Sequence, residues 1–178
     1  MKAAIVPEDA IRQRAHRVLG KARFVIVETS VVRRAARAVL LDDADLLVAI
    51  KRTKPGVPVY WTTPGGGVDP GDPTRRAALV RELREELGAE VALGEQIFLM
   101  TTSTGRGVTV QHFYLARLVS LDPELRSGAE YTDTDRGGYV VERIPLGKLA
   151  DVDLRPPELR EFILGNTAAL LADAPGPW

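Results

Sequence analysis

The chain has 178 residues, enough for one domain with a sizeable hydrophobic core, and its 24 acidic side chains balance 24 basic ones. This neutral, evenly spread charge argues against a surface that coats a nucleic-acid polymer. The absence of cysteine excludes disulfides and a thiolate nucleophile, and two histidines, His16 and His112, disfavour a metal site built mainly from histidine.

The first 30 residues are expected to form an accessory element ahead of the main domain. Pro7–Leu19 predicts a short helix, with Glu8 and Asp9 in its first turn, and Ala22–Glu28 predicts a strand. We expect this leader, residues 1–30, to supply an added edge strand or a homodimer contact. The chain has no run as long as a membrane span and no signal-peptide core at its start, so we expect a cytoplasmic protein without membrane partners.

Alternating strands and helices are expected from residue 31 onward. Val32–Leu41 and Leu46–Lys51 flank the turn signal Asp42–Asp45 and predict a hairpin. Val57–Trp61 predicts a third strand, which leads into three consecutive glycines. These glycines predict a tight strand-to-helix turn or a loop that approaches a ligand closely.

Three carboxylates share one face of the helix expected after the glycines. The stretch GGGVDPGDPTRRAALVRELREELGA contains Glu82, Glu85 and Glu86 at helical spacing, ahead of the helix stop expected at Gly88. Like charges at this spacing near a helix C-terminus are destabilising. A divalent cation would relieve the repulsion, because Mg²⁺ and Mn²⁺ prefer carboxylate oxygen. The alternative is a solvated surface face. The neighbouring stripe, which we expect to pack on the core, consists of Leu79, Val80, Leu83 and Leu87.

The same stretch resembles the Nudix box, which runs Gly, five residues, Glu, seven residues, then Arg-Glu-apolar-x-Glu-Glu-x-Gly-apolar. Gly66 and Asp72 match its first half, and the second half is filled in order from Arg81. Asp72 stands in place of the usual Glu, and eight residues separate it from Arg81. Starting at Gly67 corrects the spacing but places Pro73 at the acidic position. We prefer the first alignment, because an extra loop residue is easier to accommodate than a lost carboxylate.

The resemblance implies an activity and a set of site residues. Members hydrolyse the diphosphate linkage of a nucleoside diphosphate joined to another moiety, such as a nucleotide or nucleotide sugar. By resemblance, Glu82, Glu85 and Glu86 bind Mg²⁺ or Mn²⁺ together with a backbone carbonyl at Gly66, and the loop acid braces Arg81. The substrate is then a small nucleotide rather than a nucleic-acid polymer.

Further strands and helices are expected downstream. The pattern predicts strands over Ala92–Thr101, Val108–Leu118 and Gly138–Arg143. It predicts helices over Pro145–Leu149 and Pro157–Leu171, followed by a tail over Ala172–Trp178. Strands mixed with helices favour a mixed sheet with helices on its faces. This agrees with the α/β (α+β) fold that the resemblance implies, an α/β/α sandwich over residues 31–171.

The long acidic segment Asp122–Gly137 is a candidate source of the general base, because long loops inside compact domains are often functional. Glu130 is our first choice within it, and Glu82 is the alternative on the helix. Glu124, Asp133 and Asp135 lie nearby in the same segment, and for any one of them a solvated acidic loop is the interpretation we favour.

Substrate contacts are sought just ahead of the glycines. Trp61 and Tyr60 either stack on a base or pack under the sheet. Arg52, Lys51 and Lys54 either meet phosphates or face water.

Two rival functions of the same fold are weighed. A non-catalytic nucleotide-binding module is the alternative, although such modules tend to lose box carboxylates and this chain keeps all three. Isopentenyl diphosphate isomerase relies on a cysteine, which this chain lacks.

Overall fold

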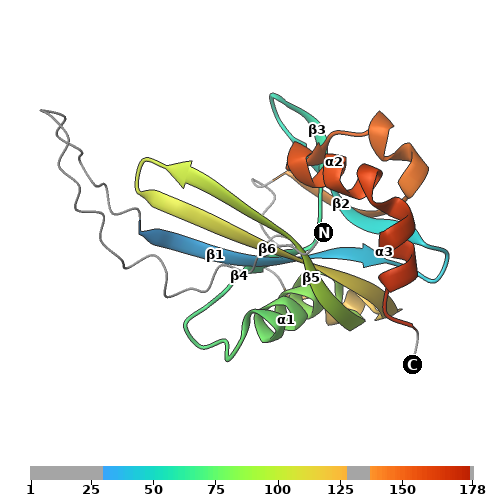
Figure 1. The fold of residues 1–178 in the computed structure, drawn as a ribbon, viewed down its shortest axis with the longest axis horizontal. Coiled ribbons are helices and arrows are strands. Elements are labelled where there is room, and N and C mark those ends of the chain that lie inside the picture. Colours follow the sequence, from blue (N-terminus) through green and yellow to red (C-terminus); the bar gives the residue numbers. More distant parts are fainter. Residues whose placement is uncertain (1–29, 128–136, 177–178) are drawn as a thin grey trace, which may run out of the picture.

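In this computed structural model, residues 30–127 and 137–176 are described, and they form one eight-stranded mixed sheet with helices on both faces (Figure 1). The leader helix and strand expected within residues 1–29 lie outside the described residues, and so does Glu130. The expected mixed sheet with helices on its faces is confirmed.

The strands in chain order are β1 (Val31–Leu41), β2 (Leu46–Lys54), β3 (Val57–Thr62), β4 (Gly65–Gly67), β5 (Ala89–Thr104), β6 (Gly107–Leu121), β7 (Gly138–Pro145) and β8 (Leu154–Arg155). The helices are α1 (Arg75–Leu87), α2 (Pro157–Gly165) and α3 (Thr167–Asp173), with 3₁₀ turns η2 (Pro123–Leu125) and η5 (Leu146–Asp151).

The strand order is β5-β6-β1-β2-β3-β8, with β4 paired to β1 and β7 paired to β2. β1 runs parallel to β6 and β3 runs parallel to β8, while the other pairs are antiparallel. The expected β1–β2 hairpin is present, but only two residue pairs next to the turn connect its strands. β2 then pairs with β7 and β3, so it joins the two parts of the sheet.

Helix α1 has well-defined ends. The Thr74 side chain accepts a hydrogen bond from the Ala77 N–H at the N-terminus, and Gly88 adopts the left-handed conformation, with φ of 65°, at the C-terminus. Between these caps, Leu79, Leu83 and Leu87 are fully buried against β1 and its neighbours. The expectation that Val80 joins this stripe is wrong: it is 47% exposed, because its position on the helix faces away from the sheet.

The two faces of the sheet carry separate cores. One cluster lies between α1 and the sheet, and the other lies between the opposite face and the C-terminal helices. Figure 1 shows α1 on one side of the sheet and α2 and α3 on the other. The residues of β2 alternate between the two clusters, with Val48 and Ile50 on the α1 side and Leu47 and Ala49 on the other.

Three expected elements differ in the structure. The glycine turn is a short strand, β4, because its backbone pairs with β1. The single helix expected over Pro157–Leu171 is two helices that meet at Asn166, and α3 continues to Asp173, two residues into the expected tail. The helix expected over Pro145–Leu149 is the 3₁₀ turn η5. Within the described residues, no helix is long and apolar enough to cross a membrane.

Replacing Leu83 by Ala should lower the free energy of unfolding by about 2–5 kcal/mol, because the side chain is fully buried and its removal leaves a cavity. Val80→Ala on the same helix should cost much less, since Val80 is half exposed. Urea unfolding in the presence of a chelator measures both. Equal losses would show that the leucine stripe does not hold α1 on the sheet.

Candidate active site

The glycine strand β4 brings backbone against helix α1. Gly65, Gly66 and Gly67 pair antiparallel with Arg37, Ala36 and Ala35 of β1. Gly65 has a φ of +121°, and a Cβ there would lie 2.3 Å from the Ala36 carbonyl oxygen. Only glycine therefore fits at position 65, and its N–H is left to face the helix.

Glu86 is buried between α1 and this strand, with 9% of its surface exposed. Its Oε2 accepts a hydrogen bond from the Gly65 N–H at 2.8 Å, and its Oε1 accepts one from the Tyr139 hydroxyl at 2.6 Å. Burial raises the pKa of the Glu86 carboxyl, and the two hydrogen bonds and the positive charge of Arg37 oppose that rise. Glu86 is thus a carboxylate fixed from two sides.

Glu82 lies one turn earlier, and its side chain is 17% exposed. A Cβ on Gly66 would lie 2.2 Å from Glu82 Oε2, so the missing side chain at Gly66 leaves the space that this carboxylate fills. Burial raises the pKa of Glu82 above its ordinary value, and the hydrogen bond from Arg81 opposes this rise. Repulsion from Glu82 adds to the rise in the pKa of Glu86, and repulsion from Glu85 and Asp69 adds to the rise in the pKa of Glu82.

Arg81 is the counter-ion of this region. Its guanidinium binds Asp72 through two nitrogens, at 3.1 and 2.9 Å, so the contact that the family resemblance implies is confirmed. It also donates to Glu82 at 3.0 Å and to Glu85 at 3.1 Å. The hydrogen bond to Asp72 is the largest cause that raises the pKa of Arg81, and the same bond lowers the pKa of Asp72. Its planar fork therefore holds the loop acid and two box carboxylates together.

The three box carboxylates are not equivalent. Glu86 and Glu82 lie against β4, whereas the Glu85 side chain is 41% exposed and contacts Arg81. Within residues 30–127 and 137–176, no three acidic or histidine side chains are already gathered as a metal site. The donors fit a hard divalent cation by their chemistry, since they are carboxylate oxygens. The absence of a side chain at Gly66 leaves space for the Glu82 carboxylate beside the backbone.

Two functional neighbours were not anticipated from the sequence. Tyr139 of β7 reaches Glu86 because β7 pairs with β2, and Arg37 of β1 lies close enough to Glu86 and Glu82 to interact with their charges. Arg37 donates to the Thr63 carbonyl at 2.8 Å and to Gln111 at 3.1 Å. Burial lowers the pKa of Arg37, and the charge of Glu86 opposes that shift. No local sequence signal marks either residue, since both depend on strand pairing.

The residues suggested for substrate contact separate onto opposite faces of the sheet. Trp61 packs against the core beneath α2, and its Nε1–H donates to Glu142 at 2.8 Å. Arg52 lies on the α1 side, where its guanidinium carbon is 4.6 Å from the ring centre of Tyr139. The structure thus connects Arg52, through Tyr139, to Glu86 and leaves Trp61 on the other face.

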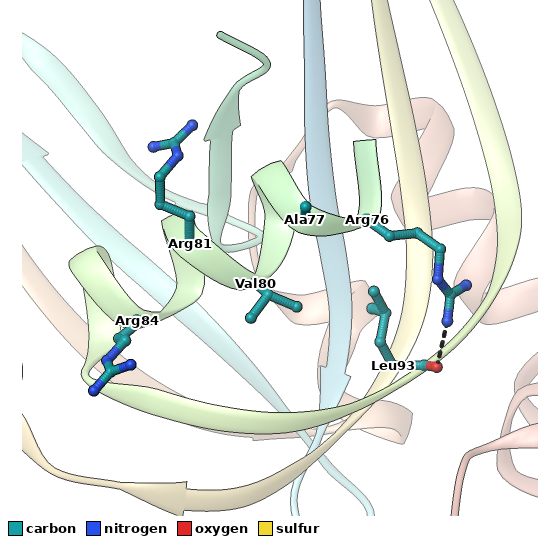
Figure 2. Close-up of a pocket in the computed structure, with 6 residues that line it drawn as sticks. All are labelled: Arg76, Ala77, Val80, Arg81, Arg84 and Leu93. Atoms are coloured by element: carbon teal, nitrogen blue, oxygen red, sulfur yellow. Dashed lines mark hydrogen bonds between the residues drawn. The ribbon is translucent and has the colours of Figure 1, made fainter. Parts of the chain in front are cut away.

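A hollow of about 600 Å³ lies on the outer flank of α1, between that helix and β5. Figure 2 shows its lining, with Arg76 pointing toward β5, where it donates to the Leu93 carbonyl, and Arg81 pointing to the other side of the helix. The lining consists of Arg76, Ala77, Val80, Arg81, Arg84 and Leu93. It contains no acidic group, so a cation would bind among the box carboxylates rather than here.

Comparison with known proteins identifies relatives. The family model of the NUDIX domain matches residues 31–159. A putative 8-oxo-dGTP diphosphatase 2 of Mycobacterium tuberculosis (strain H37Rv) is 44% identical over 131 residues, covering 62% of this chain and 88% of the relative. The CTP pyrophosphohydrolase of Escherichia coli K12 is 42% identical over 60 residues, covering 34% of this chain and only 44% of the relative.

Among solved structures, a NUDIX hydrolase from Nitrosomonas europaea superposes with a TM-score of 0.61 at 18% identity, covering 80% of this chain and 92% of that one. At this identity the likeness establishes the shared fold.

The three glycines of β4 should respond differently to alanine. Gly66→Ala should displace the flexible Glu82 carboxylate and weaken Mn²⁺ binding with little loss of stability. Gly65→Ala should instead lower the free energy of unfolding, because its Cβ would meet backbone of β1. Urea unfolding and a Mn²⁺ titration distinguish these effects.

Gly67→Ala is the matched control, since nothing lies within 4 Å of a Cβ at that position. It should change neither property. Equal Mn²⁺ affinity in the Gly66 and Gly67 variants would contradict the role given to the space at Gly66.

Glu86→Gln should stabilise the cation-free protein increasingly as pH rises above 4.5. The native carboxyl has its pKa raised above the ordinary value of 4.5, so the unfolded chain releases this proton first and rising pH favours unfolding. Glutamine removes that dependence and keeps an acceptor for the Gly65 N–H. Melting temperatures in chelator measure the difference between variant and wild type, and a difference that does not change with pH would refute the buried-charge account.

Proposed function

The chain belongs to the Nudix family of pyrophosphohydrolases, and we propose that it hydrolyses the diphosphate linkage of a nucleoside diphosphate joined to another group, with Mg²⁺ or Mn²⁺ as cofactor. One observation carries this proposal: the box carboxylates Glu82 and Glu86 lie side by side on α1 against the glycine strand β4. Hard oxygen donors in that arrangement suit a divalent cation and a phosphate substrate.

Each proposed ligand has a separate structural support. Glu86 and Glu82 supply buried or largely buried carboxylates. The Gly66 backbone lies against Glu82, and its carbonyl is kept as a proposed ligand from the family resemblance. Glu85 is more exposed and is held by Arg81, so it would reach a cation by exchanging that partner. Arg81 keeps the acidic face together before any cation binds.

When bound, a divalent cation would neutralise charge at the diphosphate and would activate a water for attack. The chain's own residues would position the substrate and take a proton from the attacking water. Glu82 is the described candidate for general base, because burial raises its pKa and makes its carboxylate a better proton acceptor. Glu130, from the acidic segment, is the second candidate and lies outside the described residues.

Substrate contacts are proposed on the α1 side of the sheet. Arg52 stacks on Tyr139, which places its positive charge on the same side of the sheet as the box carboxylates, where it would attract phosphate oxygens. Trp61 lies on the opposite face and would contact only a part of the substrate that reaches around β3. The names of the two relatives point to nucleoside triphosphates, which are also nucleoside diphosphates joined to a further group. Such a substrate is a cytoplasmic metabolite, and this is the proposed location.

Hydrolysis can be tested with a panel of CTP, 8-oxo-dGTP, ADP-ribose and a nucleotide sugar, assayed for nucleoside monophosphate. At least one compound should be cleaved with Mg²⁺, cleavage should stop in chelator, and it should return when the ion is restored. Glu85→Gln and Glu86→Gln should lower turnover by orders of magnitude, since each removes a charged ligand.

Glu90→Gln serves as the control, because Glu90 is an exposed glutamate at the start of β5, outside the box. Its turnover should match that of the wild type. Nucleotide binding without monophosphate product from any compound would instead identify a non-catalytic binding module.

A further inference from the structure

The Glu86 carboxylate is held by two donors that come from outside its own helix. The Gly65 N–H of β4 binds one oxygen and the Tyr139 hydroxyl of β7 binds the other. At 2.6 Å, the contact with Tyr139 has the length of a charge-assisted O–H···O⁻ bond. A glutamate has three rotatable bonds, so these two donors restrict a side chain that would otherwise sample several positions.

Tyr139 is itself held in place by the pairing of β7 with β2. Tyr139 lies directly opposite Arg52, whose guanidinium stacks on the ring. The two residues before it pack closely on Thr53: a Cβ on Gly137 would lie 2.1 Å from the Thr53 carbonyl oxygen, and one on Gly138 would lie 2.1 Å from Thr53 Oγ1. The glycines therefore allow β7 to approach β2 closely enough to place the hydroxyl at Glu86.

We propose that Tyr139 is a positioning residue of the cation site, whose hydroxyl orients the Glu86 carboxylate toward a divalent cation. This inference rests on the proposed function, because it takes Glu86 as a cation ligand. The stacked guanidinium of Arg52 fixes the ring, so a residue proposed to meet phosphate also supports the cation ligand. Groups that orient metal ligands in this way commonly change metal affinity when they are removed.

A purely structural role for the hydroxyl would have a different signature. If Tyr139 only satisfied a buried carboxylate, its removal would lower stability and leave cation affinity unchanged. A positioning role requires that affinity itself falls, and that the lost activity returns when the cation concentration is raised.

The experiment compares Tyr139→Phe with wild type in the full-length chain. Phenylalanine keeps the ring and its stacking with Arg52 and removes only the hydroxyl. Free Mn²⁺, counted by electron paramagnetic resonance during a titration without nucleotide, should show affinity weakened roughly 10-fold or more. Turnover at low Mg²⁺ should fall, and high Mg²⁺ should restore most of it.

Tyr114→Phe is the matched control. Tyr114 is also packed beneath α1 with an arginine, Arg76, over its ring, but no contact joins its hydroxyl to a box carboxylate in the described structure. Its Mn²⁺ affinity should equal that of wild type. A similar loss in both variants would overturn the inference, because the effect would then come from general loosening under α1.

The outcomes also separate this inference from the function on which it rests. A wild-type protein that binds Mn²⁺ and hydrolyses a nucleotide, alongside a Tyr139→Phe variant with undiminished Mn²⁺ affinity, would overturn the positioning role alone. A wild-type protein that neither binds Mn²⁺ nor hydrolyses any nucleotide would overturn both. Melting temperatures in chelator establish that each variant is folded.

Discussion

Burial of one carboxylate between a helix and a glycine strand is the constraint on which the rest of the site depends. The leucines of α1 bring the helix down onto the sheet, and Glu86 is carried with them into a poorly solvated position. A buried carboxylate needs donors. The Gly65 N–H and the Tyr139 hydroxyl provide them, and each has its own requirement: a positive φ at Gly65, and close pairing of β7 with β2. The packing that buries Glu86 and the strand pairing that supplies its donors therefore depend on each other.

The clustered negative charges of the box are managed by two different means. Arg81 contacts Asp72, Glu82 and Glu85. It therefore relieves much of the repulsion among the carboxylates, which the sequence alone suggested a cation would relieve. Glu86 lies deeper, where it accepts hydrogen bonds from the Gly65 N–H and the Tyr139 hydroxyl and lies near the positive charge of Arg37. Because Arg81 holds the outer carboxylates, α1 can form without a cation. The case for a cation rests on Glu82 and Glu86, whose carboxylates lie side by side on α1 against the glycine strand β4.

The alternation of strand residues divides the substrate candidates between two environments. Neighbouring residues of a strand face opposite sides of the sheet, so Arg52 lies with the box helix while Lys51 lies with Trp61 and Glu142 on the other side. The hollow on the outer flank of α1 is a third environment, lined by arginines and apolar groups. The carboxylates of the box, rather than the depth of the hollow, identify the face on which a cation and a diphosphate would meet.

The sequence by itself determined the motif and most of the strands and helices, because these depend on local spacing. Helical periodicity placed Glu82, Glu85 and Glu86 on one face beside the leucines, and the order of residues from Arg81 identified the family. It misplaced Val80, because periodicity defines a stripe but not its edge against the sheet. Only the tertiary structure decided that the glycines form a strand, that Tyr139 and Arg37 lie beside Glu86, and that Trp61 lies on the opposite face of the sheet. Those outcomes depend on which strands pair and in which register, and contacts between residues more than 50 positions apart, such as Tyr139 with Glu86, leave no local pattern in a single sequence.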